Sequence, residues 1–106
     1  MQMKTPVSKN RMPKHPGETL LEKHLKPRGL TVVAAAKLLG TSRVRLAGIV
    51  EEHNPVSAEM ALRLARLLGT TPDFWMDLQR DWDLWHIRRS PAAADIEEIE
   101  PVLLAK

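Results

Sequence analysis

Gly40 constrains the fold of this chain more than any other residue. It separates two short stretches with apolar residues at helical spacing, and only Thr41 and Ser42 follow it before the second stretch. Glycine adopts the left-handed conformation that ends a helix without steric cost, and serine is a favoured N-cap. The pattern predicts helices over residues 32–39 and 43–51, and a connection this short forces them to cross steeply.

Two helices that cross steeply need small side chains at the crossing and apolar side chains beneath it. Ala35 and Ala36 are the small residues of the first helix. On a helical wheel of the second helix, Leu46, Ile49 and Val50 cluster on one side and define the inward face. Residues 31–52 therefore match a helix-turn-helix.

The rest of the chain also has helical signals, and no stretch alternates like a strand. We expect helices over residues 17–26, ended by Pro27 and Gly29, over residues 58–68 and over residues 72–89. Residues 92–100 form either a short helix or a loose segment. The fold class is all-α, with a flexible basic arm at 1–14, one domain at 15–90 and an acidic tail at 91–106.

Composition excludes several classes of protein. The chain has no cysteine, no apolar run long enough to span a membrane and no apolar segment typical of a secretory signal. The four histidines are spread over four segments, and no nucleophile–base pair, glycine-rich phosphate loop or zinc signature occurs. We therefore expect a cytoplasmic protein that is not an enzyme, does not contact a membrane, and needs neither a metal nor a cofactor.

Charge is distributed unevenly along the chain. Residues 1–30 carry seven Lys or Arg against two Glu, whereas residues 91–106 carry one Lys against four acidic residues. A basic first part favours a polyanionic partner. The basic arm either follows DNA phosphates, covers a protein partner or only increases solubility.

The outward face of the second helix of the helix-turn-helix is the candidate DNA-binding surface. N-terminal residues of such a helix reach base edges, so Arg43 is the candidate for a guanine contact or a phosphate clamp. Val44 and Ala47 can contact thymine methyl groups, and Ser42 with the first amides can hold a phosphate. Glu51 and Glu52 would be repelled by DNA, and the alternative is a helical hairpin that no longer binds it. The predicted set is Thr31, Ser42, Arg43, Val44, Arg45, Ala47 and Gly48.

All four aromatic residues of the chain lie in the predicted helix over residues 72–89. Most of this aromatic stripe is expected to close the core. A second apolar side of the same helix exceeds what one small monomer buries, which favours an interface with a second subunit or another protein. The predicted interface residues are Trp75, Met76, Trp82, Leu84 and Ile87.

Four motifs then indicate a family. They are His-Pro-Gly-Glu at 15–18, Ser-Ala-Glu-Met-Ala-Leu-Arg-Leu-Ala at 57–65, Thr-Pro-Asp-Phe-Trp at 71–75, and Leu-Gln at 78–79 with Asp-Leu-Trp at 83–85. In this order and spacing the chain resembles the HigA-type antitoxins, the VapI-like group of the Xre helix-turn-helix family. It departs from the family pattern at Glu51-Glu52, where an Asn-Gly pair commonly ends the recognition helix.

The resemblance implies a dimeric, five-helix, lambda-repressor-like DNA-binding protein. Such a protein would neutralise a small RelE-like ribonuclease toxin and repress its own operon at a palindromic operator in double-stranded DNA. Two alternatives remain at this point: a stand-alone transcription regulator without a toxin, and a protein-binding inhibitor that has lost DNA recognition.

Overall fold

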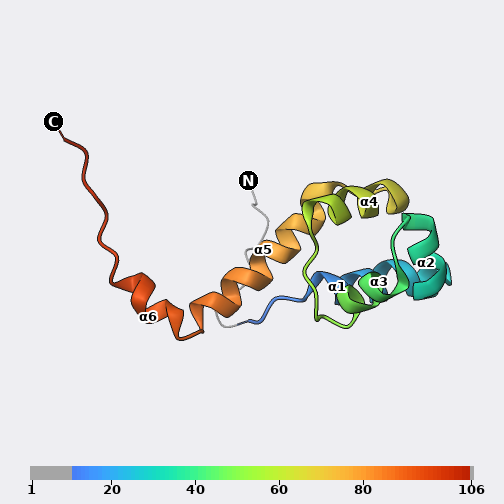
Figure 1. Ribbon diagram of the computed structural model, residues 1–106, viewed down its shortest axis with the longest axis horizontal. Coiled ribbons are helices and arrows are strands. Elements are labelled where there is room, and N and C mark those ends of the chain that lie inside the picture. The colour runs from blue at the N-terminus through green and yellow to red at the C-terminus, as the bar shows by residue number, and fades with distance from the viewer. Residues whose placement is uncertain (1–10, 106) are drawn as a thin grey trace, which may run out of the picture.

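Helices make up all the regular structure of residues 11–105, the part of the chain that the computed structural model describes. The α1–α4 segments and the first half of α5 form a compact body, from which the rest of α5, α6 and the C-terminal segment extend away (Figure 1). The elements are α1 (Pro16–Thr19), η1 (Leu20–Leu25), η2 (Lys26–Arg28), α2 (Val32–Leu39), α3 (Arg43–Val50), α4 (Ala58–Leu68), α5 (Pro72–Arg88) and α6 (Ala92–Glu97). The all-α prediction is confirmed. Within these residues no helix is both long and apolar enough to cross a membrane.

Local capping interactions fix the ends of the central helices. Each of α2, α3, α4 and α5 is preceded by a capping residue. The side-chain oxygen of that residue accepts a hydrogen bond from the backbone amide three residues later, at 3.0–3.1 Å. The glycines that end α2 and α4 are left-handed, with φ of 72° and 73°. The Ser42 cap and the helix end at Gly40 agree with the sequence prediction, because such signals act within a few residues. The capping residues are Thr31, Ser42, Ser57 and Thr71.

The first helical segment differs from the prediction. Pro27 does not end it, because the chain continues through a 3₁₀ turn to Arg28 and stops at Gly29, which has φ of 67°. Upstream, the Lys26 amide donates to the carbonyl of Leu21, five residues back, so the turn before the proline is widened. A proline ring clashes with the carbonyl four residues before it in a regular α-helix, and the wider turn relieves that clash.

The core lies where η1, α2, α3, α4 and the start of α5 meet. Ala35 and Ala36 are buried against α3, as their small size predicted. On α5, the Gln79 side-chain oxygen accepts a hydrogen bond from the Val56 amide at 2.8 Å, which ties α5 to the loop before α4. The largest buried apolar side chains are Leu20, Leu25, Leu46, Ile49, Met60, Leu64 and Trp75.

The acidic segment after α5, for which the sequence left two possibilities open, forms the short helix α6 and then an extended stretch. Helix α6 has no buried residue. The sequence predicted a basic arm over residues 1–14, and residues 1–10 of this arm lie outside the described part of the chain.

Candidate DNA-recognition face

Helix α3 presents one buried side and one open side. Leu46 and Ile49 are fully buried, while Arg43 and Arg45 are exposed and Val44 has 76% of its surface open. Ser42 is the N-cap of the helix, and its hydroxyl oxygen accepts a hydrogen bond from the Arg45 amide. The exposed side chains therefore belong to the first turn of α3, the part of a recognition helix that reaches base edges.

The predicted DNA-binding residues are placed unequally on this face. Thr31 and Ser42 are exposed N-caps of α2 and α3, and Ala47 is half-buried. The space beside Gly48 is filled by the side chain of Asn54, which a Cβ at this position would overlap. The structure thus provides a packing reason for this glycine, and its contact with DNA stays a prediction.

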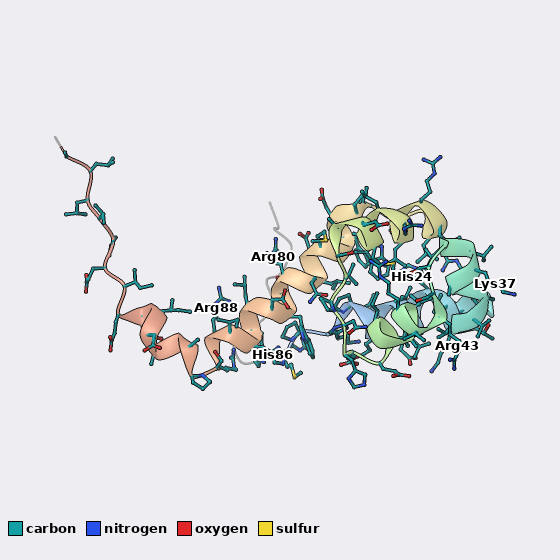
Figure 2. All side chains as sticks on the ribbon, in the orientation of Figure 1. His24, Lys37, Arg43, Arg80, His86 and Arg88 are labelled. Atoms are coloured by element: carbon teal, nitrogen blue, oxygen red, sulfur yellow. The ribbon has the colours of Figure 1, made fainter. Side chains whose placement is uncertain are left out.

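Positive charge gathers at the end of the molecule that α2 and α3 form. Lys37 and Arg43 both lie at this end, away from the cationic residues of α5 (Figure 2). Among residues 11–105, Lys37, Arg43 and Arg45 form no ion pair, so their charges are available to a polyanion. Lys37 was missed by the sequence reasoning, although its place opposite the buried face of α2 was a usable signal.

Arg63 of α4 supports the turn between α2 and α3. Its guanidinium donates to the carbonyl of Leu39 at 2.7 Å and to that of Gly40 at 3.5 Å, and it is paired with Glu59 at 2.9 Å. The hydrogen bond from Arg63, the charge of Arg63 and then the charge of Arg45 hold the pKa of Glu59 below its ordinary value. Arg63 therefore satisfies carbonyls that the end of α2 leaves without a helical partner.

The end of α3 shows the consequence of the departure from the family pattern. Glu52 has φ of 66°, and it is the one non-glycine residue of the described chain with a positive φ. The glycine that commonly stands there adopts this conformation without strain, whereas glutamate does so at a cost. Glu51 and Glu52 are both exposed.

The His-Pro-Gly-Glu motif buttresses α3 from behind. The Nδ1 atom of His15 accepts a hydrogen bond from the Gly17 amide at 2.8 Å, so His15 is the N-cap of α1. A Cβ on Gly17 would overlap the carbonyl oxygen of Ile49, so only glycine allows α1 to lie this close to α3. His15 also meets the edge of Trp82, with 4.9 Å between ring centroids. Through this motif, α1 packs closely against the recognition helix and also contacts α5.

On α5, the structure corrects one predicted interface residue. Trp75 has 0% of its surface exposed and donates from Nε1 to the Thr70 hydroxyl at 2.7 Å, so it belongs to the core and has no surface left for a partner. Leu84 and Ile87 are exposed, whereas Met76 and Trp82 are partly buried. The wheel places Trp75 and Trp82 on one stripe, but only the body of the molecule decides where that stripe leaves the core.

The described residues contain no group of three or more His, Cys, Asp or Glu side chains able to hold a metal ion. The acidic residues of α5 are engaged in other ways. Arg80 pairs with Asp77 and Asp81 at 3.1 and 3.2 Å, and Asp83 accepts a hydrogen bond from Gln79 at 2.9 Å. Asp77, Asp81 and Asp83 are therefore engaged with other side chains of their own helix.

Comparison with known proteins places this geometry in a family. Residues 21–75 match the model of a helix-turn-helix family. The chain is 45% identical over 83 residues to virulence-associated protein I of Dichelobacter nodosus, covering 77% of both proteins. It is 36% identical over 78 residues to antitoxin HigA-1 of Vibrio cholerae, covering 74% of this chain and 73% of that protein.

A solved structure extends the likeness to three dimensions. The antitoxin HigA of Pseudomonas aeruginosa, solved with the higBA promoter, superposes with a TM-score of 0.78 at 36% identity, covering 86% of this chain and 99% of that one. The match to four spaced motifs and the match in fold agree. This chain belongs to the HigA antitoxin family of Xre-type helix-turn-helix proteins, a class of DNA-binding regulators rather than enzymes.

Proposed function

We propose that this protein is the antitoxin of a toxin–antitoxin pair, that it represses its own operon as a homodimer on a palindromic operator, and that it neutralises a small RelE-like ribonuclease. The observation that carries the proposal is the open first turn of α3, with Arg43 and Arg45 exposed and Lys37 at the same end of the molecule. The HigA relative was solved with the higBA promoter, which supports a DNA-binding role for this chain.

On the operator, each exposed group has a distinct role. The Ser42 hydroxyl already accepts a hydrogen bond from the Arg45 amide as the helix cap. The amides of α3 that precede Arg45 are therefore the ones that hold a phosphate, together with Lys37. Arg43 reads a guanine through two parallel hydrogen bonds, and Val44 contacts a thymine methyl group. The exposed Glu51 lies at the far end of the helix, where it opposes a closer approach of DNA.

The second apolar side of α5 supports the protein–protein part of the proposal. Leu84 and Ile87 are exposed on the half of α5 that leaves the compact body (Figure 1). Apolar side chains in a row on an exposed helix favour contact with a second copy or with the toxin. This surface is remote from the first turn of α3, so repression and neutralisation use separable surfaces.

The separation is tested by a charge reversal on α3. Arg43→Glu combined with Arg45→Glu places carboxylates beside phosphates and should abolish repression, while growth rescue from the toxin persists. Both residues are exposed, so the melting temperature should stay near that of the unchanged protein. The assay is co-expression with the candidate toxin gene from the same operon, scored for growth, together with a promoter reporter.

A matched control carries Lys23→Glu and Arg28→Glu, two exposed cations of the first helical segment. It changes the net charge by the same amount away from α3 and should retain repression. Loss of growth rescue by a folded α3 double variant would place the toxin on the DNA-binding face. Repression retained by that variant would contradict the assigned recognition helix.

A further inference from the structure

An apolar groove lies between α2 and α4, on a face that neither the recognition helix nor the exposed side of α5 uses. It has a volume of about 620 Å³ and is lined by Leu38, Leu39, Leu62, Arg63, Arg66 and Leu67. Leu38 and Leu62 are 61% and 60% exposed, unlike Leu39 and Leu64 of the same two helices, which are buried. A leucine pair this open beside a groove marks a surface that a partner covers.

The rim of this groove carries a positive charge. Arg63 is held by Glu59 and by the turn carbonyls, but Arg66 forms no ion pair among residues 11–105. The occupant should therefore be apolar and bear negative charge at its edge. These two properties exclude a basic segment.

The C-terminal segment of the chain has both properties. Val102 and Leu104 are 96% and 94% exposed, Leu103 lies between them, and the described chain places nothing against them. Immediately before them stand four acidic residues, none of which is in an ion pair within residues 11–105: Asp95, Glu97, Glu98 and Glu100.

We propose that the segment of residues 99–104 of one copy docks into the α2–α4 groove of a second copy. Val102 and its two neighbours lie on Leu38 and Leu62, and the preceding carboxylates face Arg66. In a closed dimer each copy gives its segment to the other, so both grooves and both segments are covered at once. This contact leaves the first turn of α3 open.

The groove of the same chain is out of reach. The C-terminal stretch and α2 lie at opposite ends of the long axis of the molecule, which measures 56 Å, and α6 lies on the side of the C-terminal stretch (Figure 1). The six Cα–Cα steps from Glu97 to Leu103 span at most about 20 Å when extended. A second copy is therefore the source of the segment.

Disulfide trapping tests the docking directly, because the chain has no cysteine of its own. Full-length protein with Leu103→Cys is activated as a mixed disulfide with a small aromatic thiol and mixed with full-length protein carrying Leu62→Cys. We expect rapid release of the small thiol and a covalent pair of chains on non-reducing electrophoresis. The matched control is Val33→Cys, an exposed residue of α2 that does not line the groove.

Equal trapping at Leu62→Cys and Val33→Cys would overturn the proposal. So would an intrachain disulfide as the main product of the Leu62→Cys, Leu103→Cys double variant at micromolar concentration. A second variant keeps the test independent of the cysteines: Leu38→Asp with Leu62→Asp should lower the dimer mass fraction in sedimentation, whereas Val33→Asp should not. Trapping is read without DNA or toxin, so failure of the proposed repression or neutralisation would leave its result unchanged.

Discussion

Arg43 stands at the first position of α3 with its side chain exposed, so its removal affects binding without disturbing the core. Arg43→Ala should weaken operator binding by about 1–3 kcal/mol and weaken binding to random DNA less, because a guanine contact is lost along with a charge. Fluorescence anisotropy with both duplexes measures the difference. Arg80→Ala, on α5, removes one charge far from α3 and serves as the control. Equal losses on both duplexes would make Arg43 a phosphate contact only.

His15 couples the stability of the protein to pH. Burial lowers its pKa from the ordinary value of 6.5, the charges of Glu52 and Asp83 oppose this, and His86 adds to the lowering. The unfolded chain therefore takes up a proton at a pH where the folded chain does not. The contribution of His15 to the unfolding free energy is therefore fully present above about pH 6.5 and is lost as the pH falls below that value. Burial and then the charge of Arg28 lower the pKa of His24 as well, in the same direction.

The test replaces His15 with a residue that caps but does not titrate. His15→Asn keeps an oxygen for the Gly17 amide and should reduce the loss of unfolding free energy between pH about 7.5 and about 5.5. Urea unfolding followed by tryptophan fluorescence measures the loss in both proteins. The part due to His24 should remain in the variant. An unchanged pH dependence would show that His15 does not contribute.

Among the elements, the α2–α3 turn depends on a residue from α4. Arg63→Met removes the donors to the Leu39 and Gly40 carbonyls and should lower the unfolding free energy by about 1–2 kcal/mol. It should also weaken operator binding at temperatures where the variant is folded, because the crossing of α2 and α3 is less well fixed. Glu59→Gln, which leaves the carbonyl hydrogen bonds in place, should change both quantities little. Comparable effects of the two substitutions would assign the stabilisation to the ion pair instead.

The end of α3 offers a stabilising substitution. Glu52→Gly removes the strain of a left-handed glutamate, worth about 1–2 kcal/mol, and offsets part of that gain by added freedom in the unfolded chain. A net increase of roughly 0.5–1 kcal/mol in unfolding free energy is expected from urea titration. Glu52→Val, which is β-branched, should decrease it. A less stable Glu52→Gly would mean that the carboxylate makes a compensating interaction.

At the scale of the whole molecule, a homodimer should place two α3 helices on one side of the DNA. The footprint on the promoter should then show two half-sites about 34 Å apart, one helical turn of the duplex. Hydroxyl-radical footprinting checks the spacing, and light scattering checks the mass of the free and bound protein. A single unrepeated protected site with a monomeric protein would refute the dimer.

For α2, α3, α4 and α5 the sequence alone determined the first residue and, to within one residue, the last, because caps and left-handed glycines act within one turn. Ser42 and Gly40 do in the structure what their positions predicted. The exposure of Arg43 and Arg45 followed from a helical wheel of α3, because helical periodicity is also a local pattern. The error at Pro27 also has a local cause, since a widened turn upstream makes room for its ring.

The tertiary structure decided what depends on residues distant in the chain. Arg63 reaches the Leu39 carbonyl across 24 positions, and Gly17 is required by a carbonyl on α3, so neither role was visible in a local pattern. Trp75 and Trp82 share one face of α5, yet only Trp75 is fully buried, because the rest of the body covers the helix completely at Trp75 and only partly at Trp82, where His15 packs against it. Periodicity shows which residues share a face, whereas packing against other elements determines how much of that face is covered.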